Sequence, residues 1–537
     1  MWANNMKMRN HKFTIETLEA WLSSKVGVME RGHFLLLLLL IIYCLIFSGL
    51  AVGRYYAFKT CAWDLGIFTQ SLWTTLFANR FFYYTCELFI NPSGCFFGVH
   101  FSPVLFFVLP FYRLYTAPET LLIFQSLIIA LAALPIYKLA KEQLNSRLAG
   151  LTFALAYLIY PAIQWVNWYD FHVQAFLPIF FTFTIYYATK RNWVQYFVFL
   201  VLSLMCIEHV AFITFFIGLY IAWRYKRIMI SRIKRKEIFT SEILVPLLTI
   251  AVSVIWYWFT LWQRDTFFPT NPIAIEEFLG AANFTILGAK SPLEIPVLIL
   301  FRPLNAIQAL IYNGHMKLLF LFLIFGPLAF YSFRKPSALI PTIPWFLFSF
   351  VSQALVHYSL GNHYPAFITA FVFISAIFGV KSVYPSNKIK NLKKALKKIL
   401  ICSIVIFLIA SPLSPLVYVL FPEKVIFIGE HERILSNIIS KLPQNVSILT
   451  QDNIFPHVSH NINAYVVPIR HLTTSIQNLV IDFVNQTIDH VEYILLDNKT
   501  DPVSTSLVVS LLEKKSDFLL MDSWDNNTIL LYRKTKN

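Results

Sequence analysis

The sequence predicts an α-helical polytopic membrane protein with a small extracytoplasmic α/β domain at its C-terminus. Of its 537 residues, 57% are apolar and only 13% are charged, whereas soluble domains carry about 25% charged residues. Apolar runs recur along the first 420 residues, many near the length of about 20 residues that crosses a bilayer, and they predict about 11 transmembrane helices. The last 117 residues differ, with 13 acidic and 10 basic residues. A purely soluble enzyme is excluded.

The first candidate span, 34–52, follows a polar, basic N-terminal segment, residues 1–33. A signal peptide is the alternative, but no clear small-residue cleavage site follows the run, so we expect an uncleaved span with the N-terminus in the cytoplasm. The further candidate spans are 120–139, 149–163, 174–189, 193–207, 210–223, 242–262, 316–332, 338–356, 364–380 and 399–420.

Basic residues indicate which loops face the cytoplasm. Seven lie within 224–236 and seven lysines lie within 381–398, beside apolar runs. This is the positive-inside pattern of a multi-pass plasma-membrane protein, so the net charge of +16 does not indicate nucleic-acid binding. Alternation of sides then places the first outer loop (54–119), the long outer loop (263–315) and residues 421–537 outside the cytoplasm.

Two further patterns support the C-terminal assignment. Short apolar runs at 446–450, 464–467, 493–496, 518–521 and 529–532 predict strands, and 433–441 and 504–514 predict helices. Glycosylation triplets occur at Asn283, Asn445, Asn485, Asn498 and Asn526, all in segments assigned outside. The last 117 residues are therefore expected to form an extracytoplasmic α/β domain.

The first outer loop is the most informative segment. Residues 61–73, CAWDLGIFTQSLW, predict a short amphipathic helix at the membrane interface, with Asp64 near its start and Gln70 farther along. Asp64 either balances the helix dipole or acts as a general base or metal ligand facing a lipid-accessible cavity. Of the cysteines in this loop, Cys86 and Cys95 are the favoured disulfide pair.

Other outer turns carry acid or imidazole groups in a chain with few acids. They hold His100; Asp170 with His172; Glu208 with His209; and His363 with Tyr364. The four histidines and Tyr364, together with Gln70, are the candidate substrate-binding residues of these turns and of the first outer loop. The apolar run 104–112 after His100 is too short to cross comfortably and predicts a re-entrant or interfacial helix. Carboxylates and imidazoles at one mouth suit general-base chemistry or a divalent cation, Mg²⁺ or Mn²⁺, with Asp64 and His100 as tentative ligands. The alternative is a polar network that holds short helices together.

Several motifs together resemble a prokaryotic, largely archaeal family of predicted multi-spanning membrane proteins of unknown function. They are Asp64–Trp73, His100–Pro103, Pro110–Gln125, Asp170–His172, Glu208, His363–Tyr364, Ile448–His460, Tyr465–Pro468 and Tyr493–Asp497. The resemblance covers about residues 34–534, nearly the whole chain.

The layout also resembles the GT-C glycosyltransferases, which use polyprenyl-phosphate-linked sugars. This resemblance implies a GT-C-like transmembrane domain over 34–420 and a catalytic acid in the first outer loop, where Asp64 matches. Many GT-C enzymes have paired acids there, but Asp64 has no acidic neighbour, and His209 stands where an acid is expected after Glu208.

The implied reaction is an inverting sugar transfer from a polyprenyl-phosphate donor to a glycan, lipid or protein acceptor. Asp64 would deprotonate the acceptor, with Glu208 and Asp170 also in the catalytic set. The candidate groups for the leaving phosphate are Arg264, Lys290 and Arg302 in or beside the long outer loop, although each suits equally an interfacial cation. A lipid-linked-sugar flippase and a non-catalytic envelope assembly protein are the alternative functions; the latter predicts that Asp64, Glu208 and Asp170 do not converge.

Overall fold

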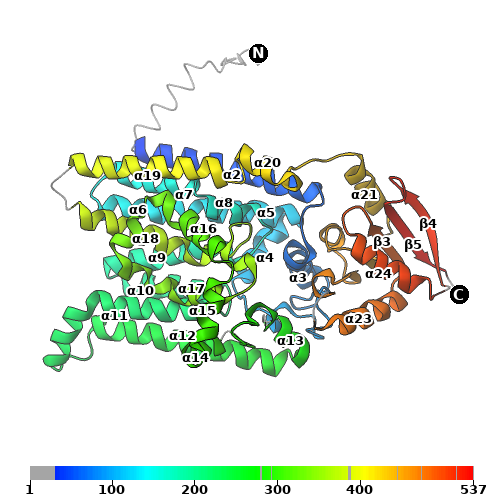
Figure 1. Cartoon of the computed structure of the whole chain (residues 1–537), viewed down its shortest axis with the longest axis horizontal. Helices are drawn as coiled ribbons and strands as arrows, with labels where there is room; N and C mark the ends of the chain where they lie inside the picture. Colours follow the sequence, from blue (N-terminus) through cyan, green and yellow to red (C-terminus); the bar gives the residue numbers. More distant parts are fainter. Residues whose placement is uncertain are drawn as a thin grey trace, which may run out of the picture.

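The structure, a computed structural model, describes residues 31–278, 281–291, 293–384, 389–443, 445–472, 475–515 and 517–535. The predicted cytoplasmic segment 1–33 lies almost wholly outside the described residues. Long helices run side by side through most of the molecule, and the strands gather at one end (Figure 1).

Helices occupy every predicted span. In chain order they are α2 (Arg31–Tyr56), α3 (Ile67–Phe77), α4 (Leu105–Leu114), α5 (Pro118–Leu131), α6 (Ala133–Gln143), α7 (Arg147–Leu158), α8 (Pro161–Trp168), α9 (Leu177–Lys190), α10 (Trp193–Leu204), α11 (Val210–Lys234), α12 (Ser241–Phe267), α13 (Pro272–Phe278), α14 (Glu294–Phe301), α15 (Pro303–Ile311), α16 (Gly314–Phe325), α17 (Ile343–Val351), α18 (Ala366–Val383), α19 (Ile389–Ala410) and α20 (Pro415–Leu420). Short α4 falls where the re-entrant or interfacial helix was expected.

Five helical segments among the described residues are long and apolar enough to cross a membrane. They are Gly32–Tyr56, Pro118–Gln143, Ser241–Phe267, Ala366–Val383 and Lys390–Leu420. Two bent pairs, α7 with α8 and α14 with α15, raise the number to seven if each pair is one span. The chain is thus a membrane protein with several apolar helices, and the number of about 11 spans stays a prediction.

The described residues of the two basic clusters lie at the end of the helix bundle opposite the strands (Figure 1). The turn between α11 and α12 and the facing ends of α18 and α19 lie at the end away from the strands (Figure 1). These are the regions that carry the basic clusters of 224–236 and 381–398. This arrangement agrees with the predicted alternation of sides, and the orientation of the chain in a membrane stays a prediction.

The C-terminal region forms a five-stranded sheet in the order β2-β1-β3-β5-β4. The strands are β1 (Ile448–Thr450), β2 (Ala464–Val466), β3 (Tyr493–Asp497), β4 (Phe518–Trp524) and β5 (Ile529–Lys534), and the helices of the region are α21 (Glu430–Lys441), α22 (Phe455–Val458), α23 (Gln477–His490) and α24 (Pro502–Leu512). Strands β2, β1 and β3 are parallel, with Leu449 opposite Tyr465 and Ile494, whereas β5 is antiparallel to β3 and β4. Every predicted strand is present, and α23 was not predicted.

One hydrophobic core joins the sheet to the membrane helices. It includes Trp63 and Leu65 from the first outer loop together with Ile454 and Phe455 from the segment that follows β1. The expected interfacial helix is therefore wrong in one respect: almost all of residues 62–74 are buried. The polar face is covered because the C-terminal region supplies hydrogen-bond partners for it instead of water or lipid headgroups.

Candidate functional site

A cavity of about 410 Å³ lies where the first outer loop, the outer turns and the C-terminal region meet. Its polar lining includes Asp64, Glu87, His100, His172, His209, His363 and Arg470. The other lining residues are mostly apolar and include Phe212, Ile295, Leu347, Phe348 and Phe367. A mixed lining of this kind suits a ligand with a polar head and an apolar chain.

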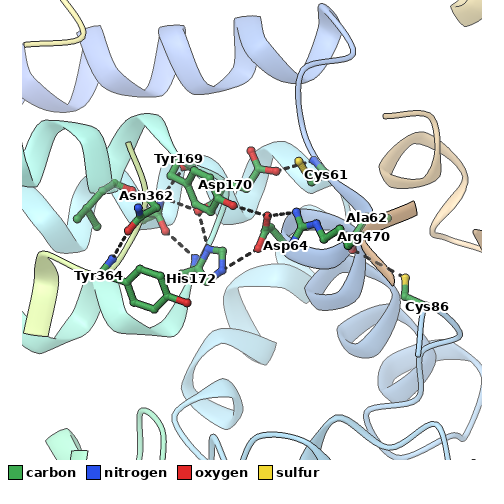
Figure 2. Close-up of polar contacts among 12 residues, drawn as sticks. Cys61, Ala62, Asp64, Cys86, Tyr169, Asp170, His172, Asn362, Tyr364 and Arg470 are labelled. Carbon is green, nitrogen blue, oxygen red and sulfur yellow. Dashed lines mark hydrogen bonds and ion pairs between the residues drawn. The ribbon is translucent and has the colours of Figure 1, made fainter. Parts of the chain in front are cut away.

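Asp64 lies in a π-helical turn, Ala62–Gly66, that leads into α3. The turn rotates the carboxylate inward, where 4% of the residue is exposed. Its Oδ1 is 3.0 Å from Nε2 of His172, and its Oδ2 is 3.1 Å from Nη2 of Arg470. The Tyr169 hydroxyl also donates to Oδ2 at 2.8 Å, so cationic and neutral donors surround the carboxylate (Figure 2).

Asp64 is held in its ionised form. Burial alone raises the pKa of a carboxyl group, but the Arg470 guanidinium and the His172 imidazole outweigh burial and hold the pKa of Asp64 well below its usual range. Both nitrogens of His172 face acceptors, because Nδ1 lies 3.1 Å from the carbonyl oxygen of Asp170. His172 therefore bridges the Asp64 carboxylate and the backbone at Asp170.

Asp170 fixes the backbone around this carboxylate. Its Oδ1 is 3.0 Å from Nη1 of Arg54, at the end of α2, and its Oδ2 accepts a hydrogen bond from the Cys61 amide at 2.6 Å. Cys61 is the residue immediately before the π-helical turn. Asp170 therefore ties the end of the first span to the start of the loop that carries Asp64, and all its carboxylate contacts are satisfied from within the protein.

His363 is the neutral imidazole of the cluster. Its ring stacks on that of His172, with centroids 3.9 Å apart and an interplanar angle of 15°. Burial and the neighbouring His172 lower the pKa of His363 well below its usual value. Nδ1 of His363 is buried and has no hydrogen-bond partner among the described residues, so the ring can bind a hydroxyl of a ligand. The neighbouring residue, Tyr364, stacks on Trp345 with ring centroids 5.4 Å apart, and it also lines the cavity.

A second acid–imidazole cluster also borders the cavity. Glu208 Oε1 lies 3.0 Å from Nδ1 of His100 and 2.9 Å from Nδ1 of His209, while Oε2 accepts from the Phe101 amide at 3.1 Å. Burial alone would raise the pKa of Glu208, but the two imidazoles lower it well below its usual value. Burial alone would lower the pKa of His100, but Glu208 raises it. His100 and His209 line the cavity, whereas Glu208 does not.

The four remaining predicted ligand-binding residues lie away from the cavity. Gln70 donates to the carbonyl oxygen of Asn461 at 2.8 Å and so holds the C-terminal region on α3. Arg264 pairs with Asp265 at 3.0 Å, Lys290 pairs with Glu276 at 3.1 Å, and Arg302 donates to the carbonyl oxygen of Leu287 at 3.3 Å. None of these four lines the cavity in the described part of the chain.

Several residues of the site were missed by sequence reasoning. Within the described residues, Arg470 is the one lysine or arginine that lines the cavity, and its guanidinium also lies over the Trp63 ring at 5.7 Å. Tyr169 directly precedes the predicted Asp170–His172 pair, and its position between Trp168 and Asp170 was an available signal. Arg470 had none, because it is one of ten basic residues in the last 117.

Asp452 was also missed. The Ala62 amide, at the start of the π-helical turn, donates to Oδ1 of Asp452 at 2.7 Å and to its carbonyl oxygen at 2.9 Å. Burial raises the pKa of Asp452 to about 6, with Arg470 opposing the shift. Asp452 lies two residues after the end of β1, so the carboxyl edge of the parallel strands holds the turn that carries Asp64.

All six cysteines are free, so the expected Cys86–Cys95 disulfide is wrong in this structure.

Among the described residues, Cys61, Asp64 and Asp170 have ligand atoms within 4.8 Å of one another. The set fits Mg²⁺ or Mn²⁺ poorly, because these ions prefer oxygen ligands and each carboxylate already has an arginine counter-ion. His100, the other tentative metal ligand, is not a member of this set and contacts Glu208 instead.

Comparison with known proteins assigns the chain to a family. The sequence profile of a family described as predicted membrane proteins (DUF2079) matches residues 54–527. The chain belongs to this DUF2079 family. The matched range includes the first outer loop and strands β1 to β4, so this DUF2079 protein carries Asp64 and Arg470 within the family region.

Solved structures with a similar arrangement share little sequence with this DUF2079 protein. ArnT from Cupriavidus metallidurans, in the apo state, is 12% identical, with a TM-score of 0.48 and coverage of 91% of this chain and 97% of that chain. The oligosaccharyltransferase of Archaeoglobus fulgidus, in complex with zinc and sulfate, is 11% identical, with a TM-score of 0.41 and coverage of 93% and 73%. No protein of curated function matches the chain in sequence.

Proposed function

We propose that the protein is an integral membrane glycosyltransferase that moves a sugar from a polyprenyl-phosphate donor to an acceptor at the outer face of the cell membrane. The observation that carries this proposal is the cavity itself. An ionised carboxylate, an arginine and an unpartnered imidazole meet there beside an apolar wall. A lipid-linked sugar needs a cation for its phosphate, a base for the acceptor and an apolar surface for its chain.

Arg470 takes the role first assigned to Arg264, Lys290 and Arg302. Its side chain is 41% exposed, and it pairs with Asp64 at 3.1 Å. A phosphate entering the cavity would compete with Asp64 for the guanidinium, because Arg binds phosphate and carboxylate oxygens with the same planar donors. When Arg470 moves toward the phosphate, Asp64 loses a counter-ion and becomes a stronger base.

The reaction follows from these positions. The acceptor hydroxyl attacks the anomeric carbon, its proton passes to Asp64, and the bond between that carbon and the phosphate oxygen breaks. The electron pair leaves with the polyprenyl phosphate, and attack from the face opposite the leaving group inverts the configuration. Arg470 stabilises the negative charge that develops on the leaving phosphate. Asp170 positions the loop through Cys61, and Glu208 acts through His100 and His209.

Asp64 and Asp170 meet beside His172 and His363, which favours catalysis, whereas the separate position of Glu208 is what the assembly-protein interpretation predicts. Glu208 stands apart from this group, on the side of the cavity lined by His100 and His209. We propose membrane lipids and a glycan, lipid or protein acceptor as partners, with an N-terminus in the cytoplasm and the sheet outside. A divalent cation, Mg²⁺ or Mn²⁺, stays a prediction that loss of transfer in EDTA would support.

The test is transfer of radiolabelled sugar from a panel of polyprenyl-phosphate donors in membranes that contain the protein. We expect donor-dependent incorporation into an extractable glycan, lipid or protein. Equal incorporation in membranes with and without the protein, across the panel, would refute the proposed activity.

A further inference from the structure

The hairpin formed by α14 and α15 is the most apolar exposed feature of the long outer loop. The two helices meet at an angle of 108° around Arg302. The bend has a local cause, because Pro303 disfavours helical backbone at the residue before it and lacks the amide hydrogen that would continue α14. Between 293 and 312 the only charged residues are Glu294 and Arg302.

Large apolar side chains project from the corner of this hairpin. Leu300 is 78% exposed, Phe301 79% and Leu304 80%, and Ile307 and Ile311 continue the apolar surface along α15. An apolar patch of this kind is unstable in water and marks a contact with another apolar phase. Both charged residues are exposed, but each makes a hydrogen bond with the neighbouring backbone: Glu294 accepts from the Lys290 amide at 2.9 Å, and Arg302 donates to the carbonyl oxygen of Leu287.

The inner face of the hairpin belongs to the cavity wall. Leu293, Ile295 and Pro296 line the cavity. Ile295 also packs in a small core with Ala306 and Ala309 of α15 and with Val351 and Phe348 of α17. The hairpin therefore has the cavity on one face and exposed apolar side chains on the other, on the side of the bundle away from α2 and α19 (Figure 1).

We propose that this hairpin lies in the hydrocarbon of the outer leaflet and forms the entrance through which the lipid chain of the substrate passes from the bilayer into the cavity. The occupant of the outer face is lipid because the exposed surface is predominantly apolar and belongs to a membrane protein whose span α12 likewise exposes Ile255, Trp258 and Trp262. The lipid-entry part of this inference rests on the proposed function. The location of the hairpin in the bilayer is independent of the proposed function.

Photo-crosslinking with p-benzoylphenylalanine tests the seating. The photoreactive residue replaces one of three exposed leucines in turn: Leu304 at the corner, Leu45 on the span α2, or Leu519 on strand β4. In phosphatidylcholine nanodiscs, we expect lipid adducts by mass spectrometry at positions 304 and 45 and none above background at 519. Labelling at 304 that matches position 519, or that joins 304 to a second protein chain, would overturn the inference.

A second arm tests the entrance, with polyprenyl phosphate added to the nanodiscs. The photoreactive residue replaces Leu293, which lines the cavity, and we expect adducts of polyprenyl phosphate there. Leu304→Asp should lower these adducts because a charge is costly in hydrocarbon, whereas the matched control Leu519→Asp should leave them unchanged. Absence of polyprenyl adducts at 293 beside lipid adducts at 304 would refute the entrance. Adducts at both positions without sugar transfer would refute only the proposed enzyme activity.

Discussion

Replacing Arg470 with glutamine removes the guanidinium that lies 3.1 Å from Asp64. Breaking a buried ion pair costs about 3–5 kcal/mol, because the remaining charge is left without a partner. Here 41% of the Arg470 side chain is exposed, so solvent screening reduces the expected loss of stability to about 1–2 kcal/mol. Asp64 also keeps its contacts with Tyr169 and His172, and the fold should survive.

The effect of Arg470→Gln on transfer should be larger than its effect on folding. A hydrogen bond to a charged group contributes about 1.5–3 kcal/mol, and if that bond forms to the leaving phosphate its loss slows transfer about 10- to 100-fold. Arg470→Lys keeps the charge without the planar donors and should be intermediate. Arg533→Gln, an exposed arginine over the Tyr493 ring, is the matched control.

The assay for these variants combines sugar transfer from a polyprenyl-phosphate donor with thermal unfolding of the purified protein. We expect wild-type transfer in Arg533→Gln, a partial loss in Arg470→Lys and the largest loss in Arg470→Gln. Wild-type rates in Arg470→Gln, with the variant folded, would refute the assignment of the leaving phosphate to Arg470.

Two further predictions concern the contact between the first outer loop and the C-terminal region. Gly66→Ala should destabilise the protein by about 1–3 kcal/mol, because a Cβ there would lie 2.6 Å from the Phe455 ring. In thermal unfolding, adding Phe455→Leu to Gly66→Ala should restore part of the lost stability. An unchanged stability in Gly66→Ala would contradict this close packing. Because burial raises the pKa of Asp452 to about 6 in the folded protein, its contribution to stability is full below pH 4 and is lost as the pH rises through 6. Asp452→Asn keeps an acceptor for the Ala62 amide. In this variant the unfolding free energy should depend less on pH between pH 4 and pH 6 than in the wild type. An unchanged slope of unfolding free energy against pH would show that another group titrates.

Sequence patterns predicted the helices and strands well because both depend on local apolar runs. Long uncharged stretches such as 34–52 leave few alternatives to a membrane helix, and the short apolar run at 493–496 forms the central strand β3. The polar residues of the outer turns could also be recognised from the sequence. Charged groups beside spans are costly, which singled out Asp64, Asp170 and His172 before their contacts were known.

The sequence-based predictions that were wrong or incomplete concern residues whose positions depend on contacts between distant segments. Gln70 looks like the polar face of an interfacial helix in sequence, but in the structure it contacts Asn461, 391 residues farther along the chain. Arg470 lies 406 residues from Asp64, and no local pattern separates it from the other basic residues of its region. The Cys86–Cys95 pairing assumed that outer-loop cysteines pair, whereas both are free and buried.

The most direct test of the proposed function compares wild type with Asp64→Asn in the polyprenyl-phosphate sugar-transfer assay, with expression and folding verified. Asparagine keeps the size of the side chain and an acceptor for Tyr169, but it cannot take the acceptor proton. The exposed carboxylate of Asp265, paired with Arg264, supplies the matched control Asp265→Asn. We predict donor-dependent transfer in wild type and Asp265→Asn and its loss in Asp64→Asn. Transfer that persists at the wild-type rate in Asp64→Asn would contradict the central role of this carboxylate.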